Sequence, residues 1–396
     1  MSMSPLPIAA FSIVSALGVG QAATRSALRE GRGGLARRRF ETCTLDTWIG
    51  MVDAVDDVRL NAALADWDCR NNRLAELALA SDDFAHHVHR AAQLAGAARV
   101  GVFLGTSTSG ILSTEIAYRE RDAVTGALPA WLHYEQTHDN ASLARYVRAA
   151  LGLAGPAWVI STACSSGAKA YASAARLIAL GVIDAAVVGG VDSLCLTTLY
   201  GFNALELLSP EICRPWDAQR NGLSLGEGAS FALLQRDAAE PVGWLLGCGE
   251  SSDGHHMSAP HPEGAGAALA MRAALAQSGL DAGAVDYVNL HGTATPNNDA
   301  AEDLAVCAVF GREVPVSSTK GATGHTLGAA GAIESAITLL ALQDGLVPAG
   351  LNLREPDPAL QANYQQRPLR RPLRAAANNS FGFGGSNACL LFGAAR

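Results

Sequence analysis

The sequence is poor in charged and aromatic residues, which make up 17% and 6% of its 396 residues, whereas hydrophobic residues make up 49%. So few charges exclude an intrinsically disordered chain, and a chain this long and this apolar can bury a large core. No stretch has the roughly 18 uninterrupted apolar residues of a membrane helix, so no membrane span is predicted. Basic residues are not in excess either: the formal net charge of −8 argues against nucleic acid as a partner, because phosphates require a concentrated basic surface.

The sequence also lacks closely spaced cysteine pairs and a signal-peptide pattern. Its eight cysteines are dispersed without a C-x-x-C motif, which argues against a zinc site and a disulfide framework and predicts a reducing, cytoplasmic location. The first 24 residues carry no charge, as in a signal peptide, but they lack the basic start, and Pro5 and Pro7 interrupt the apolar run. We therefore expect residues 7–14 to form a buried first strand.

Short apolar runs alternate with alanine-rich stretches along the chain, which is the pattern of an α/β fold with helices on both faces of its sheets. The expected strands include residues 100–104, 158–160, 185–188, 285–290 and 389–392. Residues 159–181 and 316–345 resemble each other, since each reads as a strand, a Ser-Thr turn and a helix of small residues. This similarity fits an internal duplication and equally the reuse of a common α/β unit. We place the division after residue 240, with halves 1–240 and 241–396.

The strongest local signal is Cys164, in the stretch S-T-A-C-S-S-G at 161–167 between an expected strand and an expected helix over 168–180. The free N–H groups and the dipole at a helix N-terminus stabilise a thiolate, so this position predicts a nucleophilic cysteine. Gly167 and its small neighbours would let the backbone bend and let an acyl group approach the sulfur. The alternative is a small buried residue without a chemical role, which is the commoner fate of a cysteine.

A second signal is His291, which follows an expected strand and precedes G-T-A-T-P. Functional side chains of α/β folds gather at this end of the strands, although a single histidine there is more often a hydrogen-bonded structural group. Asp299 and Glu302 have the spacing of a capping box, and we expect them to begin a helix that ends near Phe310.

A third signal is the run from Ser317 to Glu334, in which Lys320, His325 and Glu334 stand among small and apolar residues. A helix of Ala, Gly and Ile that carries a single glutamate would bury that carboxylate, and a buried carboxylate requires a partner. Lys320 is the nearest cation in the sequence. We therefore expect it to pair with Glu334 rather than to lie on the surface.

A fourth signal is the glycine-rich stretch N-S-F-G-F-G-G-S-N at 379–387, whose glycines permit close backbone approaches. It could be misread as a nucleotide-binding loop, but it lacks the following helix that gives a G-x-G-x-x-G pattern its meaning. The histidines within residues 252–261 could suggest a metal site. Adjacent histidines in an extended chain point to opposite sides, so we predict no metal there.

Six motifs, taken in order along the chain, resemble those of the elongating β-ketoacyl-acyl carrier protein synthases of types I and II. They are T-A-C-S-S-G, R-P-W-D (214–217), L-G-E-G (225–228), H-G-T-A-T-P, S-S-T-K-G-A-T-G-H-T-L-G-A-A-G-A-I-E and N-S-F-G-F-G-G-S-N. The resemblance runs nearly from end to end. It implies the thiolase fold, a duplicated five-layer αβαβα arrangement, and a dimer made either of two copies or of this chain and a paralogous chain-length factor.

The resemblance implies a decarboxylative Claisen condensation between an acyl chain on Cys164 and malonyl-acyl carrier protein. In it Cys164 would be the nucleophile, and His291 and His325 would promote decarboxylation and condensation. Lys320 would lie beside the histidines, with Glu334 behind it. Substrates would be carried on the phosphopantetheine of acyl carrier protein, with no other cofactor and no metal. Thioester exchange onto a cysteine is nucleophilic catalysis, and N–H donors would stabilise the enolate that remains after carbon dioxide leaves.

The resemblance also implies how substrate is held. The backbone N–H groups of Cys164 and Phe381 would form the oxyanion hole, and the Phe381 ring would close the acyl pocket until the cysteine is loaded. The residues implied in substrate or pantetheine binding are Thr108, Thr293, Thr295 and Phe383. Of these, Thr108 stands where the family often carries a bulkier apolar residue that lines the acyl pocket across the dimer interface.

Two further features of the resemblance concern the partner and the pathway. An acyl carrier protein is acidic and requires cations on its partner, and Arg70 and Arg73 stand where family members place them. Residues 208–214 are short where fatty-acid enzymes carry a longer carrier-facing loop, and residues 250–264 look most like synthases from aryl polyene clusters. We therefore expect a role in fatty acid, polyketide or aryl polyene biosynthesis.

Four other classes of protein share parts of this pattern. A thiolase uses a second cysteine in C-x-G, but Cys389 is followed by two leucines, and a starter-type synthase uses a Cys-His-Asn set. A chain-length factor is a non-catalytic partner subunit that generally lacks the nucleophile. A Cys-His hydrolase would leave one of the two histidines unexplained.

Overall fold

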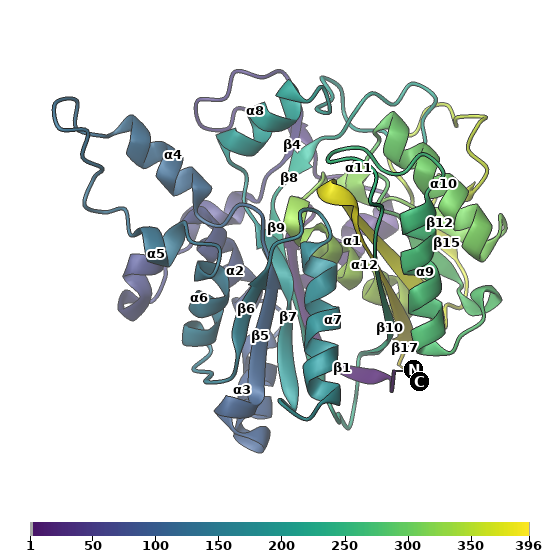
Figure 1. Ribbon diagram of the computed structural model, residues 1–396, viewed down its shortest axis with the longest axis horizontal. Coiled ribbons are helices and arrows are strands. Elements are labelled where there is room, and N and C mark those ends of the chain that lie inside the picture. Colours follow the sequence, from purple (N-terminus) through teal and green to yellow (C-terminus); the bar gives the residue numbers. More distant parts are fainter. Residues whose placement is uncertain (1–2, 396) are drawn as a thin grey trace.

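The structure is a computed structural model that describes residues 3–395, and two units of five strands form its frame (Figure 1). The first unit consists of β1 (Leu6–Ser15), β5 (Val100–Gly105), β6 (Ala157–Ile160), β7 (Ala185–Asp192) and β9 (Gly228–Gln235). The second consists of β10 (Gly243–Ser252), β11 (Tyr287–Asn289), β12 (Pro315–Ser317), β16 (Ala375–Gly382) and β17 (Ser386–Ala394). The units join where β1 pairs with β10.

The two units have the same topology. Their strand orders are β6-β5-β7-β9-β1 and β12-β11-β16-β17-β10, and numbering the strands of each unit along the chain gives 3-2-4-5-1 in both. In each order the first three strands run parallel, and the fourth and fifth pair in antiparallel fashion. This identity shows that the similarity between 159–181 and 316–345 reflects an internal duplication. The connection between the units is residues 236–242.

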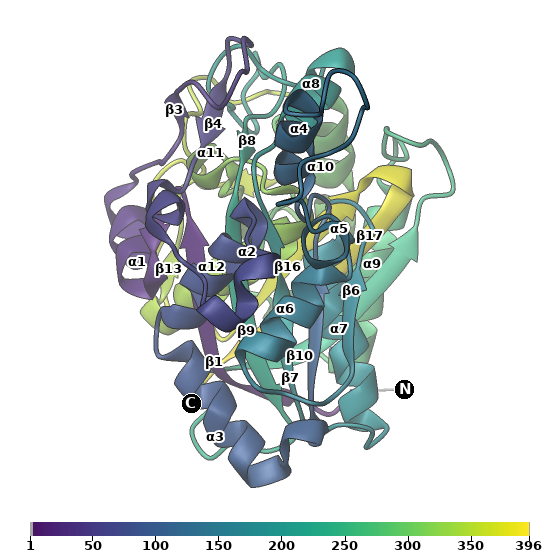
Figure 2. The same cartoon turned by 90° about the vertical axis from the view of Figure 1, so that its left-hand side faces the viewer.

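Helices cover both outer faces and fill the space between the sheets, so the molecule has five layers. Between the sheets lie α7 (Ser166–Ala179) and α12 (Ala330–Asp344). The outer face of the first sheet is covered by α2 (Arg70–Ala80), α3 (Phe84–Ala95) and α6 (Ser142–Ala150), which face the viewer in Figure 2. The outer face of the second is covered by α9 (Ala265–Ser278) and α10 (Pro296–Phe310). The αβαβα arrangement implied by the resemblance is confirmed.

The composition of α12 explains how both sheets share one core. Residues 330–342 are all buried, and almost all of them are small or apolar. A helix that is apolar on every side is buried on every side, which is what a position between two sheets requires. The main hydrophobic cluster accordingly combines side chains of α12 and α7 with those of strands from both units.

The remaining elements lie around this frame. The helices are α1 (Gly20–Glu30), α4 (Ile111–Arg119), α5 (Tyr134–Thr137), α8 (Leu196–Ala204) and α11 (Lys320–Thr323). The short strands are β2 (Gly18–Val19), β3 (Ala36–Arg37), β4 (Trp48–Gly50), β8 (Leu225–Gly226), β13 (Leu346–Val347), β14 (Asn363–Tyr364) and β15 (Leu369–Arg370). In Figure 1, α4 and the loop that follows it project from the body. Among the described residues no helix has the length and apolar character needed to cross a membrane.

The expected elements are confirmed except at one helix start. The first strand covers residues 7–14, and the other expected strands fall on β5, β6, β7, β11 and β17. The capping-box prediction for Asp299 and Glu302 is wrong, because α10 begins at Pro296 and both acids lie inside the helix. Proline suits the first helical position because its fixed φ is helical and the N–H it lacks would have no partner there.

We predict that Gly167→Ala destabilises the fold, because a Cβ at this position of α7 would lie 2.8 Å from the Gly328 carbonyl oxygen and 3.0 Å from the Ala332 amide nitrogen. Both are backbone atoms, and overpacking against them costs about 1–3 kcal/mol. Urea denaturation measures this loss. The control is Gly201→Ala in α8, where a Cβ meets no atom within 4 Å. Equal unfolding free energies for the two variants would contradict the prediction.

Candidate active site

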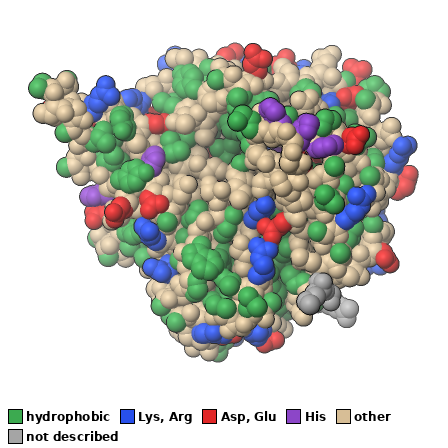
Figure 3. All heavy atoms as spheres, in the orientation of Figure 1, with side chains coloured by type: hydrophobic (Ala, Val, Ile, Leu, Met, Phe, Trp, Pro, Cys, Tyr) green, Lys and Arg blue, Asp and Glu red, His purple; other side chains and the backbone are tan. Residues whose placement is uncertain are grey.

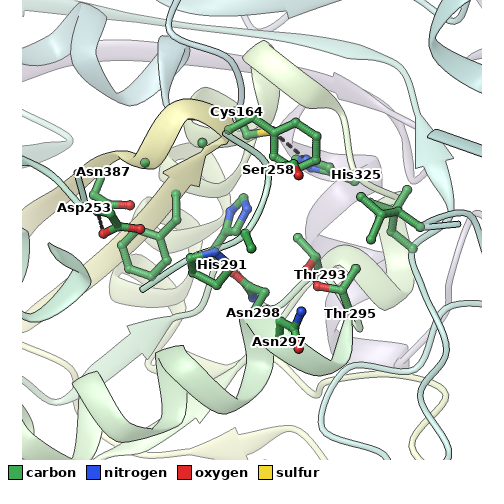
Figure 4. Close-up of a pocket in the computed structure, with 18 of the residues that line it drawn as sticks. Cys164, Asp253, Ser258, His291, Thr293, Thr295, Asn297, Asn298, His325 and Asn387 are labelled. Atoms are coloured by element: carbon green, nitrogen blue, oxygen red, sulfur yellow. Dashed lines mark hydrogen bonds between the residues drawn. The ribbon is translucent and has the colours of Figure 1, made fainter. Parts of the chain in front are cut away.

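Cys164 lies on a tight turn between β6 and α7. Ala163 has a φ of 52°, a left-handed conformation that costs free energy for any residue with a Cβ. The Ser166 N–H donates to the Ala163 carbonyl at 3.1 Å, and the Thr162 N–H donates to the Ser166 hydroxyl at 2.9 Å, so the turn is held closed. The resulting conformation directs the Cys164 side chain into a pocket (Figure 4).

This pocket is a cavity of about 150 Å³ with walls from both units. The first unit contributes Cys164, Phe202, Leu207 and Leu223, and the second contributes Asp253, Ser258, Ala259, Pro260, His291, Thr293, Thr295, Pro296, Asn297, Asn298, His325, Phe381, Gly382, Phe383, Gly385 and Asn387. Asp253 is the only Asp, Glu, Lys or Arg in the lining, within the part of the chain that the structure describes. The lining suits a largely uncharged substrate.

Two histidines meet the thiol inside this pocket. His325 Nε2 lies 3.0 Å from Cys164 Sγ, although the two residues are 161 positions apart. The rings of His291 and His325 lie 5.3 Å apart at 85°. The sulfur and one ring nitrogen of each histidine all lie within 4.8 Å of one another. The structure thus brings together the three residues that the sequence singled out separately.

Lys320 lies behind the histidines and pairs with Glu334, as expected from the sequence. Both side chains are almost completely buried, and the ammonium donates to the Glu334 carboxylate. The same Nζ lies 3.4 Å from His291 Nδ1. Because an ammonium can only donate, Nδ1 is the acceptor, and the proton of the neutral ring is on Nε2. Lys320 therefore sets His291 as an N–H donor toward the pocket.

Burial determines the charge state of these groups. Desolvation raises the pKa of Cys164 to about 12, although Lys320 opposes the shift. Desolvation lowers the pKa of both His291 and His325 well below the usual range, and Lys320 adds to the effect. The direction is opposite to the thiolate expected at a helix N-terminus: α7 begins two residues after Cys164, and desolvation is the largest influence on the thiol and raises its pKa. The resting site contains a thiol and two neutral imidazoles.

The backbone N–H that faces the thiol belongs to a residue two positions beyond the one that the resemblance implied. Phe381 lies inside β16 opposite Asn387, and its ring packs 5.7 Å from the His291 ring. The backbone N–H of Phe383, by contrast, faces the Cys164 thiol and acts to lower its pKa. The rings of both phenylalanines line the pocket, and the Phe383 ring packs 5.7 Å from the Phe202 ring. The backbone N–H near the thiol is therefore that of Phe383 rather than Phe381, and the pocket-closing role expected of the Phe381 ring stays a prediction.

The two threonines predicted to hold the pantetheine arm lie together in the pocket wall. The hydroxyl oxygens of Thr293 and Thr295 are 2.9 Å apart, and Figure 4 shows them below His325. Each keeps a lone pair or proton that a narrow polar ligand can use.

Thr108 does not line this pocket. It is fully buried, its hydroxyl donates to Asp192 at 2.8 Å, and it accepts from the Ser193 N–H at 3.1 Å. Asp192 also accepts from the Gly328 N–H, so it connects this loop of the first unit to the residues that follow His325. The Thr108 hydroxyl is therefore a structural contact within the chain, and its place in an acyl pocket across a dimer interface stays a prediction.

Arg70, expected on the carrier-docking surface, is instead committed to a buried ion pair. Its guanidinium donates two hydrogen bonds to Glu227, which is fully buried, and a third to Asp56. Removing one partner of such a pair leaves an uncompensated buried charge. Arg73 is more exposed but is paired with Asp68. On the face shown in Figure 3, Lys and Arg side chains are scattered rather than gathered into one patch.

Sequence reasoning also missed the role of Glu302, which positions His291. The buried Glu302 carboxylate accepts hydrogen bonds from the N–H groups of His291 and Gly292, at 2.8 and 2.7 Å, and from the Asn379 side chain at 3.1 Å. Burial raises its pKa to about 7. No isolated acid marked this role in the sequence, because α10 also contains Asp299 and Asp303, whereas Glu334 stands among small and apolar residues.

The three central residues also form the one group, within residues 3–395, whose donor atoms are close enough to share a metal ion. A thiolate with two imidazoles would suit zinc. However, the buried ammonium of Lys320 lies 3.4 Å from His291, and a positive charge there opposes a second cation. His255 and His261, whose rings are 5.2 Å apart, belong to no such group. The geometry favours nucleophilic and acid–base chemistry.

Comparison with known proteins identifies the family. The model described as "Beta-ketoacyl synthase, N-terminal domain" matches residues 74–240, and the one described as "Beta-ketoacyl synthase, C-terminal domain" matches residues 242–354. The chain belongs to the β-ketoacyl synthase family. It is a condensing enzyme of the 3-oxoacyl-acyl carrier protein synthase type.

Individual relatives agree with this assignment. The chain is 36% identical to 3-oxoacyl-[acyl-carrier-protein] synthase 2 of Vibrio cholerae over 75% of this chain and 76% of that protein. It is 40% identical to the mitochondrial 3-oxoacyl-[acyl-carrier-protein] synthase of Arabidopsis thaliana over 61% of this chain, but that match spans only 57% of the plant protein. A chain in the structure of the Xenorhabdus doucetiae ketosynthase ApeO in complex with its chain length factor ApeC superimposes with a TM-score of 0.88 and 36% identity, covering 98% of both chains.

We predict that the rate of Cys164 alkylation by iodoacetamide rises about tenfold per pH unit from about pH 7 to pH 10, because only the thiolate reacts and the pKa of about 12 lies above this range. Mass spectrometry of the Cys164 peptide measures the rate at each pH. Cys164→Ser reports any signal from other cysteines. A plateau near neutral pH would reveal a preformed thiolate and disprove this prediction.

Proposed function

We propose that this chain elongates acyl chains: it accepts an acyl group from an acyl carrier protein on Cys164 and extends it by two carbons with malonyl-acyl carrier protein. The observation that carries the proposal is the contact between the Cys164 thiol and His325, with His291 and Lys320 beside it in one pocket. A nucleophile with two neutral histidines suits a reaction that needs both a transferable proton and two N–H donors.

A Cys-His hydrolase is the competing function, and one observation disfavours it. In hydrolases of this kind a carboxylate or amide accepts a hydrogen bond from the histidine and orients it. Here His325 Nδ1 is buried without a hydrogen-bond partner among the described residues. The partner of His291 Nδ1 is the ammonium of Lys320, which is a donor. Neither histidine is oriented as a hydrolase requires.

In the first step the Cys164 thiol transfers its proton to His325 Nε2 while the sulfur attacks the thioester carbonyl carbon. The carbonyl oxygen becomes an oxyanion that the N–H groups of Phe383 and Cys164 stabilise. The carbon–sulfur bond to the carrier then breaks, and the carrier thiolate takes a proton as it leaves. The acyl group remains bound to Cys164 as a thioester.

In the second step malonyl-acyl carrier protein loses its carboxylate as carbon dioxide. The electron pair of the broken bond moves onto the thioester oxygen, which becomes an enolate. The N–H of His291, fixed by Lys320, stabilises this charge where water is excluded, and the neutral His325 ring lies beside it. Neutral imidazoles suit this role because they donate without requiring a prior protonation.

In the third step the enolate carbon attacks the carbonyl carbon of the acyl-Cys164 thioester. A carbon–carbon bond forms, and the second oxyanion again lies at the N–H groups of Phe383 and Cys164. The bond from sulfur to the acyl carbon breaks, and the Cys164 sulfur regains a proton. The product is a 3-oxoacyl chain, two carbons longer, on the carrier, whose phosphopantetheine arm we place along Thr293 and Thr295.

We further propose that the chain works as a dimer, with a chain-length-factor subunit or with a second copy. A similar ketosynthase was solved in complex with its chain length factor. On this chain β6 is an edge strand whose Trp158 is 53% exposed, and the projecting segment of α4 and α5 exposes Tyr118, Trp131 and Tyr134. Large exposed apolar side chains beside an open sheet edge are typical of a protein interface.

We place the reaction in fatty acid, polyketide or aryl polyene biosynthesis, and residues 250–264 favour the last of these. The only prosthetic group that the proposal requires is the phosphopantetheine on the carrier. A cytoplasmic location is supported by the eight cysteines, all of which are free thiols, since disulfides form in oxidising compartments.

We predict that the wild-type protein forms an acyl adduct on Cys164 when mixed with an acyl carrier thioester, and that adding malonyl-carrier converts the adduct into a product two carbons longer. Cys164→Ala should form no adduct, because no other thiol lines the pocket. Intact-protein and carrier mass spectrometry measure both species. Failure of the wild-type chain, alone and with a paralogous partner, to form the adduct would overturn the proposed function.

We predict that the two histidines separate the two half-reactions. His291→Ala should retain acyl transfer to Cys164 and lose malonyl decarboxylation by about 100-fold, because it removes one donor to the enolate but does not contact the sulfur. His325→Ala should slow both reactions, since its Nε2 contacts Sγ. Adduct formation and release of labelled carbon dioxide are measured separately. Equal losses of the two activities in His291→Ala would refute this division.

A further inference from the structure

The chain contains only two lysines among its 29 basic residues, and both lie close to the active site. Lys320 is part of the site described above. Lys169 lies in the first two turns of α7, five residues after Cys164, and is half-buried. Within the described residues it forms no salt bridge, and its Nζ instead donates to the Ser386 hydroxyl at 2.7 Å. Nothing in the condensation steps uses Lys169.

Ser386 connects this lysine to the nucleophile turn. The Ser386 oxygen also accepts a hydrogen bond from the Ser165 hydroxyl at 3.2 Å, and Ser165 is the residue next to Cys164. The Ser165 hydroxyl lies in addition 2.8 Å from the Thr162 carbonyl. Lys169 therefore closes a hydrogen-bonded cluster that joins α7 and the nucleophile turn of the first unit to the start of β17 in the second.

Ser386 also directly follows the glycine loop, which we define as residues 382–385. Gly382 lies against the nucleophile turn, since a Cβ there would be 2.7 Å from the Thr162 carbonyl and 3.2 Å from the Cys164 nitrogen. Gly384 and Gly385 have φ values of 77° and 73°, which glycine adopts without strain. This loop carries the Phe383 N–H that reaches the Cys164 sulfur.

The loop has other fixed points as well: Gly382 pairs with Ser386 between β16 and β17, and Ser386 also pairs with Ser252 of β10. The Gly384 N–H donates to the Met257 carbonyl at 2.7 Å, and the Gly385 carbonyl accepts from the Asp253 N–H at 2.9 Å. Both are neutral backbone hydrogen bonds to residues on the outer side of the pocket, whereas the contact from Lys169 is charge-assisted and comes from a central helix. Hydrogen bonds to an ionised group are roughly twice as strong as neutral ones. The Lys169–Ser386 contact is thus the charge-assisted restraint that reaches this end of the loop from α7, in addition to the backbone pairs.

We propose that Lys169 is a positioning residue: its ammonium holds Ser386 against Ser165 and so keeps the glycine loop closed, with the Phe383 N–H on Cys164. This role rests on the proposed function in one respect, that the closed loop supplies the oxyanion hole. A lysine suits a contact that must be made and broken, because it offers a single flexible charge where an arginine offers a rigid fork.

The test removes the ammonium and measures access to Cys164. In Lys169→Met the alkylation rate of Cys164 by a bulky maleimide should rise about tenfold, because losing a hydrogen bond to a charged group shifts the closed-to-open equilibrium by at least this factor. The rate with the small reagent iodoacetamide should change much less. The ratio of the maleimide rate to the iodoacetamide rate reports opening of the loop. The melting temperature is measured as well, and an unchanged value shows that a higher ratio does not come from a general loss of stability.

Three further variants make the test specific. Ser386→Ala should reproduce the effect and should add nothing to Lys169→Met, because both remove the same contact. Lys169→Arg should restore most of the wild-type ratio. Arg176→Gln is the matched control, since Arg176 lies on the same helix, is 58% exposed and pairs with Glu250 instead. A Lys169→Met ratio equal to that of wild type and Arg176→Gln would overturn the proposal, as would strictly additive effects of the Lys169 and Ser386 substitutions.

A steady-state kinetic measurement then tests whether the Lys169–Ser386 contact affects catalysis. Lys169→Met should lower kcat for condensation about tenfold and leave the KM for the acyl carrier unchanged, because the Phe383 N–H is less often in place. A raised KM at unchanged kcat would overturn the positioning role. The alkylation ratio requires neither carrier nor malonyl substrate, so it tests the role of Lys169 independently of condensation. A wild-type chain that fails to condense would refute the proposed function and leave the alkylation result unaffected.

Discussion

The active site depends on the close packing of α7 against α12 between the two sheets. Gly167 of α7 lies against the backbone of the turn that begins α12, and Gly331 of α12 lies against the backbone of α7, so no side chain separates the two main chains. Each helix belongs to a different copy of the duplicated unit, and each follows a loop that carries a reactive residue, Cys164 before α7 and His325 before α12. The Cys164 thiol and the His325 imidazole come into contact because the helices that follow them pack against each other.

That central position also excludes water, and exclusion of water determines the chemistry. A thiol with a pKa near 12 and histidines that remain neutral cannot carry a standing charge at physiological pH. Charge arises only when a thioester is present to receive it, and preformed N–H donors then face the oxygen on which it appears. Lys320 is paired with Glu334 in this interior and acts through His291, whose tautomer it sets.

The two lysines of the chain divide the work of positioning between the two oxyanion sites. Lys320 contacts His291, which we propose as the donor to the enolate, and Lys169 contacts Ser386 beside the glycine loop, which we propose as the place of the tetrahedral intermediates. Lys169 lies near the start of the central helix α7, and Lys320 lies at the start of α11, which precedes the central helix α12. A buried carboxylate positions backbone groups in the same way: Glu302 accepts hydrogen bonds from the N–H groups of His291 and Gly292. Catalytic donors in this protein are thus held by charged groups that never contact the substrate.

The sequence by itself determined the strands, the reactive residue types, the Lys320–Glu334 pair and the family, because apolar periodicity, an isolated acid in an apolar helix and ordered motifs are local patterns. Only the tertiary structure decided that Phe383 rather than Phe381 faces the sulfur, since this depends on where β16 ends. It also decided the charge state of Cys164 and the burial of Arg70 against Glu227, 157 positions away. Desolvation and long-range pairing are properties of the packed molecule, and no stretch of sequence encodes them alone.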